Sequence, residues 1–316
     1  MPAALLPMNS TIVRSMKMLA TRARLQVGAV IAPERAVADA VRLFLTPPRR
    51  LDRDRDRAFL GGGAGFVVHA GDTRLSAWRF GPRERPAVIL SHGWGGRGAQ
   101  WHAFVPALVE AGFQAIVFDH AGHGLSEGRQ SSLVDFARGL GAVADAVAAR
   151  GVRVAGIVGH SLGAAAIAPF LRASGRDARS VLVAPPASLV GYSAWFAARL
   201  GLGENLRRRV QASVERRYGV RWEELELPAS VESLSTPALV IHDEGDTDVR
   251  MSAGLAIARA WPGARFVRTS GLGHTAILRD AGVVRDAIDF LRGEVVFAPP
   301  PARDEWSAFP GPAPLF

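Results

Sequence analysis

The sequence predicts an α/β fold: a mostly parallel, doubly wound sheet with helices on both faces. Short apolar runs alternate with longer helical patterns from Phe66 onward, which is typical of parallel strands joined by crossover helices. Most of these runs are apolar throughout, as expected for strands buried on both faces. The segments "FVVHA" and "TRLSAWRF" flank Gly71 and Asp72 and predict an antiparallel hairpin at the start of the sheet.

The predicted parallel strands follow this hairpin in chain order. Helical stretches separate them, for example residues 132–150 and 276–292. The six strand segments are "AVILSHG", "QAIVFDH", "VRVAGIVGH", "SVLVAP", "ALVIHDE" and "ARFVRTS".

Composition excludes several classes of protein. The chain has 316 residues, of which 48% are hydrophobic, and this content supports a sizeable core rather than global disorder. It has no cysteine, which excludes disulfides, thiolate zinc sites and cysteine nucleophiles and fits a reducing compartment. No apolar run approaches the ~20 residues of a membrane span. Basic residues such as Arg14 and Lys17 interrupt the apolar stretch that a signal peptide needs, so we expect a cytoplasmic protein.

The formal net charge of +9 comes almost entirely from arginine. A basic chain raises nucleic acid as a partner, but the basic residues are scattered and no recognition motif accompanies them. We therefore predict no nucleic-acid binding and interpret the charge as a contribution to solubility.

Residues 11–46 predict two helices that precede the sheet. Apolar side chains recur there at helical spacing with basic residues between them. Pro33 fits the first turn of the second helix, and Pro47 and Pro48 end it. The run "RRLDRDRDR" predicts a solvated connector, so that residues 1–58 form an N-terminal extension. Two interpretations remain open: the helices dock on the domain, which we favour, or they lie on a membrane surface.

A long insertion separates "SVLVAPP" from "PALVIHDE". Residues 188–234 are too many for a simple crossover helix, and they combine bulky aromatic side chains, such as Tyr192 and Trp222, with several arginines. We interpret this segment as a helical cap over one end of the sheet, inserted between the core segments 59–187 and 235–297. The proline-rich tail, residues 298–316, is expected to be extended along the surface or disordered.

The segment "VGHSLGAAA" places Ser161 between Gly159 and Gly163, after a strand and before a helix of small residues. This context is typical of a nucleophile elbow, in which glycines leave room for a sharp, strained turn. The N-terminus of the following helix favours developing negative charge. A helix-capping serine would explain Ser161 but not both glycines. We therefore predict that Ser161 is a nucleophile.

A serine nucleophile needs a base, and the base needs an acid that orients it. On this kind of elbow the three residues follow in the order serine, acid, histidine. Only His242 and His274 come after Ser161. His242 lies inside a predicted strand, whereas His274 lies on a glycine-rich loop after the last strand, so we predict His274 as the base. For the acid, "IHDEGDTDV" favours Asp246 at the crest of its loop, with Asp248 the main alternative.

Acyl transfer also needs two backbone N–H donors that bind the oxyanion. The residue after the nucleophile, Leu162, is expected to supply one. The glycine-rich loop "SHGWGGRG" after the first parallel strand is expected to supply the other through Trp94, whose ring would also line the acyl pocket.

In order and spacing, the segments "HGWGG", "FDHAGHGLSEG", "GHSLG", "IHDEGDTDV" and "GLGHT" resemble the motifs of an α/β-hydrolase that carries a helical cap. The resemblance covers about residues 60–293. The sequence departs from the family at Asp243, where glycine is common, and we attach little functional weight to this difference. The resemblance further implies a structural loop beside the site, outside the triad, formed by Asp119, His120, Gly122, His123 and Gly124.

The resemblance implies a serine hydrolase, most simply a carboxylesterase-like enzyme that acts on small-molecule esters and needs no metal or organic cofactor. The aromatic residues of the cap segment suit apolar groups, and a cap over the nucleophile would limit the length of the acyl chain, so we expect esters of short to medium acyl chains. Related dehalogenases and epoxide hydrolases carry aspartate at the elbow, so Ser161 argues against both activities. Thioesterase, lipase, amidase and perhydrolase chemistry remain open. A non-catalytic ligand receptor that keeps the triad also remains open, because one fold hosts many functions.

Overall fold

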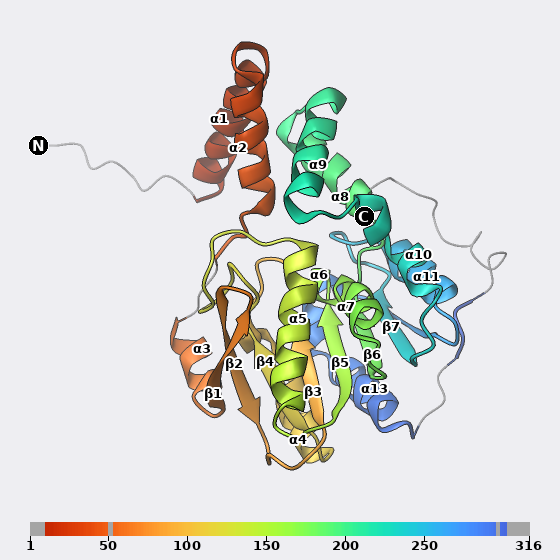
Figure 1. The fold of residues 1–316 in the computed structure, drawn as a ribbon. Helices are drawn as coiled ribbons and strands as arrows, with labels where there is room; N and C mark the ends of the chain where they lie inside the picture. The colour runs from red at the N-terminus through yellow and green to blue at the C-terminus, as the bar shows by residue number, and fades with distance from the viewer. Residues whose placement is uncertain (1–9, 50–52, 295–297, 302–316) are drawn as a thin grey trace, which may run out of the picture.

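An eight-stranded sheet lies at the centre of the computed structural model, which describes residues 10–49, 53–294 and 298–301 (Figure 1). The strand order is β1-β2-β4-β3-β5-β6-β7-β8. Strand β2 is antiparallel to β1 and β4, and the other neighbouring strands are parallel. The predicted fold class is thus confirmed. The strands are β1 (Ala64–Ala70), β2 (Thr73–Phe80), β3 (Ala87–Ser91), β4 (Gln114–Phe118), β5 (Val154–His160), β6 (Arg179–Val183), β7 (Ala238–Asp243) and β8 (Arg265–Thr269).

The predicted hairpin begins the sheet. Its register pairs Ala70 with Thr73, which leaves Gly71 and Asp72 as a two-residue turn. Gly71 has a φ of 58°, a left-handed conformation that such turns require and that glycine adopts without steric cost. The turn residues and the strand pattern therefore specify the same register.

Helices cover both faces of the sheet, and each face has its own apolar core. Ile89 of β3 belongs to the core that includes Phe136 of α5 (Leu133–Ala148), whereas the next residue, Leu90, belongs to the core that includes Phe104 of α4 (Phe104–Glu110). Successive strand residues point to opposite faces, and every residue of β3, β4, β5 and β7 is buried. This double burial explains why the strand segments read as unbroken apolar runs.

The helices of the core segments are α3 (Arg53–Leu60), α4 (Phe104–Glu110), α5 (Leu133–Ala148), α6 (Leu162–Ala165), α7 (Ile167–Ser174), α11 (Met251–Ala260), α12 (Gly273–Ala276) and α13 (Ala281–Arg292), with the 3-10 helices η1 (Gly98–Trp101) and η3 (Ile277–Arg279). Residues 276–292, predicted as one helix, are divided in the structure. Asp280 causes the division, because its carboxylate accepts a hydrogen bond from the Val283 N–H (2.9 Å) and begins a new helix there.

Between β6 and β7 the chain forms four helices where the sequence predicts the cap: α8 (Leu189–Leu200), α9 (Glu204–Tyr218), η2 (Trp222–Leu225) and α10 (Leu227–Val231). In Figure 1, α8 and α9 stand above the sheet, beyond the end of β5 from which α6 begins. The inner side of this cap is apolar, because Leu206, Val210 and Val214 of α9 and Trp222 of η2 are all buried.

The N-terminal extension forms two helices, α1 (Ser10–Ile31) and α2 (Pro33–Leu45), as predicted. They lie beside α8 and α9 rather than on the sheet (Figure 1). The side-chain amide of Gln26 donates to the Gly201 carbonyl at the end of α8 (3.0 Å), and Arg209 of α9 pairs with Glu34 of α2. Helix α2 buries one whole face. These contacts agree with docking, and the surface on which the helices dock is the cap.

The segment "RRLDRDRDR" is expected to be a solvated connector, and the structure differs in part. Asp54, Arg55 and Arg57 are exposed, but residues from Arg53 onward form α3, and Asp56 is buried, where its carboxylate pairs with the Arg97 guanidinium at 2.5 Å. The ring of Phe59 stacks on Phe80 of β2 at 5.1 Å. The apolar residues that follow the charged run therefore pack α3 against the sheet domain. Residues 50–52 lie outside the described residues.

Of the predicted tail, residues 298–301 are described and are extended. The Phe266 N–H donates to the Ala298 carbonyl (3.2 Å), and the Arg259 guanidinium donates to the Pro301 carbonyl (2.7 Å), so this part lies along β8 and α11. The expectation for residues 302–316 falls outside the described residues. Within the described ranges, no helix is both long enough and apolar enough to cross a membrane.

The outer face of α1 allows the two interpretations of the N-terminal helices to be tested, because Leu19, Val27, Val30 and Ile31 are exposed there. We expect docking on the cap to account for these helices. The protein should then stay in the supernatant when anionic phospholipid vesicles are sedimented at high salt, which screens the net charge of +9. Sedimentation with the vesicles that is lost in a Val30→Ser, Ile31→Ser variant would favour the membrane interpretation instead.

Candidate active site

Ser161 lies between the end of β5 and the start of α6, in a backbone conformation that is rare for residues other than glycine. Its φ is 53° and its ψ is −124°, which places it in a strained, sparsely populated region. The Ser161 N–H donates to the Val183 carbonyl of the neighbouring strand (2.9 Å). The turn therefore presents the side chain at the end of the sheet, where the helix begins.

The two glycines around Ser161 are required by close backbone contacts. A Cβ at Gly159 would lie 2.5 Å from Ala164 Cα, and a Cβ at Gly163 would lie 2.3 Å from the Ser91 carbonyl oxygen. Both contacts are with backbone atoms, so side-chain rearrangement cannot relieve them. The sharp turn and the close approach of α6 to β3 thus explain both glycines.

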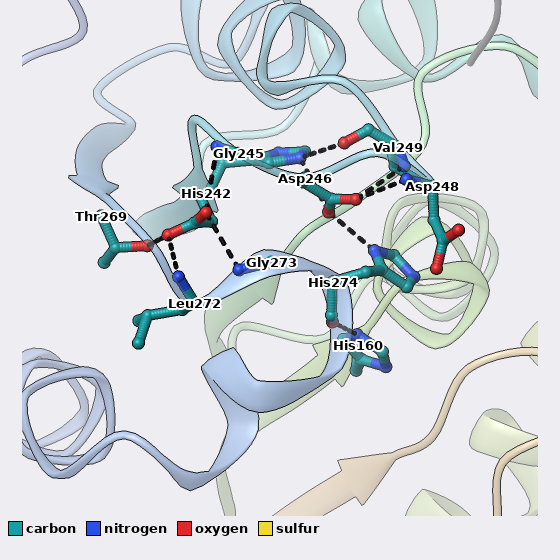
Figure 2. Close-up of polar contacts among 11 residues, drawn as sticks. His160, His242, Gly245, Asp246, Asp248, Val249, Thr269, Leu272, Gly273 and His274 are labelled. Atoms are coloured by element: carbon teal, nitrogen blue, oxygen red, sulfur yellow. Dashed lines mark hydrogen bonds and ion pairs between the residues drawn. The ribbon is translucent and has the colours of Figure 1, made fainter.

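His274 and Asp246 meet across the end of the sheet (Figure 2). Nδ1 of His274 lies 2.7 Å from Oδ2 of Asp246, and Oδ1 of Asp246 accepts hydrogen bonds from the N–H groups of Asp248 (2.8 Å) and Val249 (2.9 Å). The Asp246 side chain is buried, whereas Asp248 is exposed. Of the two acids weighed from the sequence, Asp246 is the one that contacts the histidine. His274 itself lies in the short helix α12, not on an irregular loop as expected.

The Asp246 carboxylate is held in its ionised form. Burial works to raise its pKa, but hydrogen bonds from His242, His274 and the Val249 N–H outweigh burial and lower the pKa well below its ordinary value. His242 is fully buried in β7, and its Nε2 lies 2.9 Å from the Val249 carbonyl oxygen and 3.5 Å from Oδ2 of Asp246. It packs behind the acid, as its place inside a strand suggested.

Ser161 and His274 line one cavity of about 330 Å³ beneath the cap, together with Trp94 and Leu162. The loop after β3 reaches the elbow closely, since a Cβ at Gly93 would lie 2.9 Å from Ser161 Cβ. The structure thus brings the predicted nucleophile, base, acid and two backbone donors into one region. Most of the cavity wall is apolar and aromatic, and cap residues such as Tyr192, Trp195 and Trp222 form a large part of it.

The loop after β4 lies beside this region. The Asp119 carboxylate accepts hydrogen bonds from the N–H groups of Gly98 (2.6 Å) and Leu125 (2.7 Å), and a Cβ at Gly124 would lie 2.0 Å from it. His120 stacks on Phe136 with ring centroids 3.7 Å apart. Burial lowers the pKa of His120 well below its usual value and that of His123 to about 4. These neutral, packed histidines connect the loop after β4 to the glycine-rich loop after β3 and to α5.

The comparisons with known proteins agree with this geometry. A profile of the family described as "Serine aminopeptidase, S33" matches residues 82–224. "Putative carbamate hydrolase RutD" from Klebsiella pneumoniae is 26% identical over 255 residues, 65% of this chain and 92% of that protein. "Bifunctional esterase/perhydrolase DCH" from Acinetobacter calcoaceticus is 32% identical over 130 residues, 39% of this chain and 45% of that protein. The solved structure of the Pyrococcus furiosus esterase Pf2001 has a TM-score of 0.60 at 20% identity and covers 79% of this chain and 97% of its own. The chain has the α/β-hydrolase fold, and its sequence is similar to those of hydrolases.

Asp243 has more contacts than the small functional weight expected for it from the sequence. Its carboxylate is fully buried at the end of β7 and accepts four hydrogen bonds: from Thr269 Oγ1 (2.8 Å) and from the N–H groups of Gly245 (3.0 Å), Gly273 (3.0 Å) and Leu272 (3.1 Å). It joins the loop that carries Asp246 to the segment that carries His274. The signal in the sequence is an acidic residue at a position where glycine is common.

Burial works to raise the pKa of Asp243, but the hydrogen bonds from Gly273, Thr269, Leu272 and Gly245 outweigh burial and lower it. The ionised carboxylate therefore accepts all four hydrogen bonds, and Gly273 is directly followed by His274. We interpret Asp243 as a positioning residue for His274.

His160, directly before Ser161, is a second residue at this site that no sequence pattern indicates. Its Nε2 lies 2.8 Å from the His274 carbonyl oxygen, which only accepts, so Nε2–H donates. The two imidazole rings lie 4.7 Å apart (Figure 2). Burial and the neighbouring His274 lower the pKa of His160 to about 3, so this support for the histidine is uncharged at neutral pH.

Replacing Asp243 with asparagine tests the positioning role. One carboxylate oxygen becomes an amide NH2 group, which cannot accept the hydrogen bonds that this oxygen now accepts. At pH 7 we expect Asp243→Asn to lower the free energy of unfolding by roughly 1–3 kcal/mol and to lower kcat more than it raises KM. The lowered pKa means that the stability from Asp243 is present above pH ~4 and is lost as pH falls through the folded-state value. The stability difference measured by urea unfolding should therefore shrink at low pH.

The neighbouring surface variant Glu244→Gln is the control and should change neither quantity appreciably, because the Glu244 side chain is exposed and pairs with the exposed Arg268 guanidinium at 3.6 Å. An Asp243→Asn stability difference of the same size at pH 7 and below pH ~3 would contradict the role assigned to the ionised carboxylate.

Proposed function

We propose that the hydrolase cleaves carboxylic esters with Ser161 as nucleophile, His274 as base and Asp246 as the acid that orients the base. The observation that carries this proposal is the 2.7 Å contact between His274 Nδ1 and the buried Asp246 carboxylate, at a cavity that Ser161 also lines. The contact fixes the proton on Nδ1, which leaves Nε2 without a proton and able to accept one from the serine hydroxyl.

In the first half-reaction, Ser161 Oγ attacks the ester carbonyl while Nε2 of His274 takes the hydroxyl proton. The carbonyl π electrons move to oxygen, and the backbone N–H groups of Trp94 and Leu162 stabilise the oxyanion. When the oxyanion collapses, the bond to the alcohol oxygen breaks and His274 gives its proton to the leaving alcohol. Ser161 then carries the acyl group.

In the second half-reaction, water attacks the acyl carbonyl and His274 takes a proton from it. The acid is released and Ser161 recovers its hydrogen. Throughout, the imidazolium is stabilised by Asp246, whose lowered pKa keeps it ionised. No metal or organic cofactor takes part in these steps.

The cavity favours esters with a compact apolar acyl group. Its volume of about 330 Å³ is at the small end of the range for ligand pockets, roughly 300–1,000 Å³. Its aromatic walls offer few polar partners, which suits alkyl or aryl groups better than charged ones. The cap stands above Ser161 and limits the space for a long chain.

A ligand receptor that keeps the triad is the alternative from a different class, and thioesterase, lipase, amidase or perhydrolase activity are alternatives within the same chemistry. Two relatives carry names that point to neighbouring reactions, carbamate hydrolysis and perhydrolysis. All the hydrolytic alternatives need an activated Ser161. Stoichiometric labelling by a fluorophosphonate therefore separates them from a receptor, and esters, thioesters and amides of the same acid rank the leaving groups.

Substitution of the proposed triad tests the mechanism. Ser161→Ala and His274→Ala should each lower kcat on p-nitrophenyl butyrate by several orders of magnitude with the fold retained, because nucleophile and base act as a unit. Ser161→Ala should also abolish fluorophosphonate labelling. Circular dichroism and thermal unfolding show whether the fold is retained.

Asp246→Asn and Asp248→Asn form a matched pair, since the two acids are two residues apart and only one contacts His274. The first should reduce kcat by about 10⁴-fold, as expected when the histidine takes the wrong tautomer, and the second should be nearly normal. The reverse pattern would show that Asp248 is the acid.

A series of p-nitrophenyl esters from acetate to palmitate tests the proposed acyl range. Each methylene that enters the pocket contributes about 0.8 kcal/mol, so kcat/KM should rise with chain length until the cap is reached and then fall steeply. We expect a maximum among short to medium chains. A maximum at palmitate would instead indicate a lipase whose cap is a mobile lid.

A further inference from the structure

The cavity above Ser161 has a wall that belongs to neither the sheet domain nor the cap. Phe44 and Leu45, the last two residues of α2, line it together with Ser161 and Leu162. They come from the N-terminal extension, which lies outside the matched family segment, residues 82–224. The extension therefore contributes directly to the space in which a substrate would bind.

Phe44 is fixed among aromatic rings of the cap. Its ring centroid lies 5.1 Å from that of Phe196, 5.4 Å from that of Tyr192 and 5.4 Å from that of Trp222, with the Trp222 ring inclined by only 22°. The side chain is 7% exposed. Rings at these separations pack in favourable offset or edge-to-face geometry, so Phe44 occupies one defined position on the cavity wall.

The end of α2 is also tied to the sheet domain, so its place does not depend on the cap alone. The Leu45 carbonyl accepts a hydrogen bond from the Ser131 N–H (2.8 Å). The guanidinium of Arg49 donates to the carbonyls of Ser126 (2.5 Å) and Gly122 (3.2 Å).

Pro48, three residues after α2 ends, packs against the glycine-rich loop after β3. A Cβ at Gly95, the residue after Trp94, would lie 2.8 Å from Pro48 Cγ. Gly95 has a φ of 69°, so the turn of this loop is packed directly against the segment that follows α2. The same short stretch of chain thus supports the loop below the cavity and forms the wall beside it.

We propose that helix α2 is a fixed wall of the acyl pocket and that Phe44 determines the size of the acyl group that the hydrolase accepts. This rests on the proposed esterase function. Phe44 closes the pocket at the junction of cap and core, so the apolar acyl chain of an ester meets its ring. The N-terminal extension thereby has a role in substrate selection.

Two substitutions of opposite size test this wall. Phe44→Ala should raise the ratio of kcat/KM for p-nitrophenyl decanoate to that for the butyrate about tenfold, the change expected when roughly two further methylene groups gain contact. Phe44→Trp should lower the same ratio. Val41→Ala is the control, because Val41 is buried on the same helix but does not line the cavity, and it should leave the ratio unchanged.

A purely structural role for Phe44 predicts a different result. Both Phe44 variants would then lose stability and activity on all esters in proportion, the ratio would stay constant, and the proposal would be overturned. An equal shift of the ratio in Val41→Ala would overturn it too, since loosening of the helix would then account for the effect.

A binding measurement separates this proposal from the esterase function. The affinities of butyric and decanoic acids for Ser161→Ala, with and without Phe44→Ala, are measured by calorimetry and need no turnover. If no ester is cleaved but the binding preference shifts towards decanoic acid in the Phe44→Ala variant, the proposed role of Phe44 is retained and the esterase proposal fails. If esters are cleaved and neither the kinetic nor the binding preference shifts, the wall proposal fails alone.

Discussion

The strained backbone at Ser161 is the constraint on which the rest of the site depends. A residue with positive φ and a side chain costs of order 1–3 kcal/mol and persists only where its surroundings hold it. Here the hydrogen bond from the Ser161 N–H to β6 holds it. The backbone around it is also packed so closely at Gly159, Gly163 and Gly93 that a Cβ at any of these positions would clash. The same close packing brings β3, its glycine-rich loop and α6 together. The proposed nucleophile and the proposed oxyanion donors are therefore fixed by one local arrangement.

The histidine reaches this arrangement through a second set of contacts at the ends of β7 and β8. Asp246 contacts the imidazole, whereas Asp243 holds the backbone just before it and His160 holds its carbonyl. Asp243 at the end of β7 and Asp246 in the loop after it thus have different contacts: Asp246 with the imidazole ring of His274 and Asp243 with the backbone before it. A positioned base is more effective than a mobile one because its orientation costs no entropy during the reaction.

The sequence was sufficient to predict what depends on local pattern. Apolar runs located all eight strands, and the glycines around Ser161 located the elbow, because a sharp turn has few chemical solutions. The sequence does not predict the contacts between segments that are distant in the chain. Nothing local shows that Asp56 would meet Arg97, that Phe44 would stack on Trp222, or that Asp243 would accept four hydrogen bonds. Such pairings depend on the tertiary packing, which composition and periodicity do not encode individually.

If acyl transfer passes through Ser161, as we propose, the acyl intermediate can be trapped on that residue. The protein is mixed with excess p-nitrophenyl butyrate, quenched with acid within the first turnover, and examined by intact-protein and peptide mass spectrometry. We expect one butyryl group per chain, located on the peptide that contains Ser161, and its absence from Ser161→Ala. Rapid ester cleavage with no adduct in repeated quenches under burst conditions, or an adduct on another residue, would contradict it.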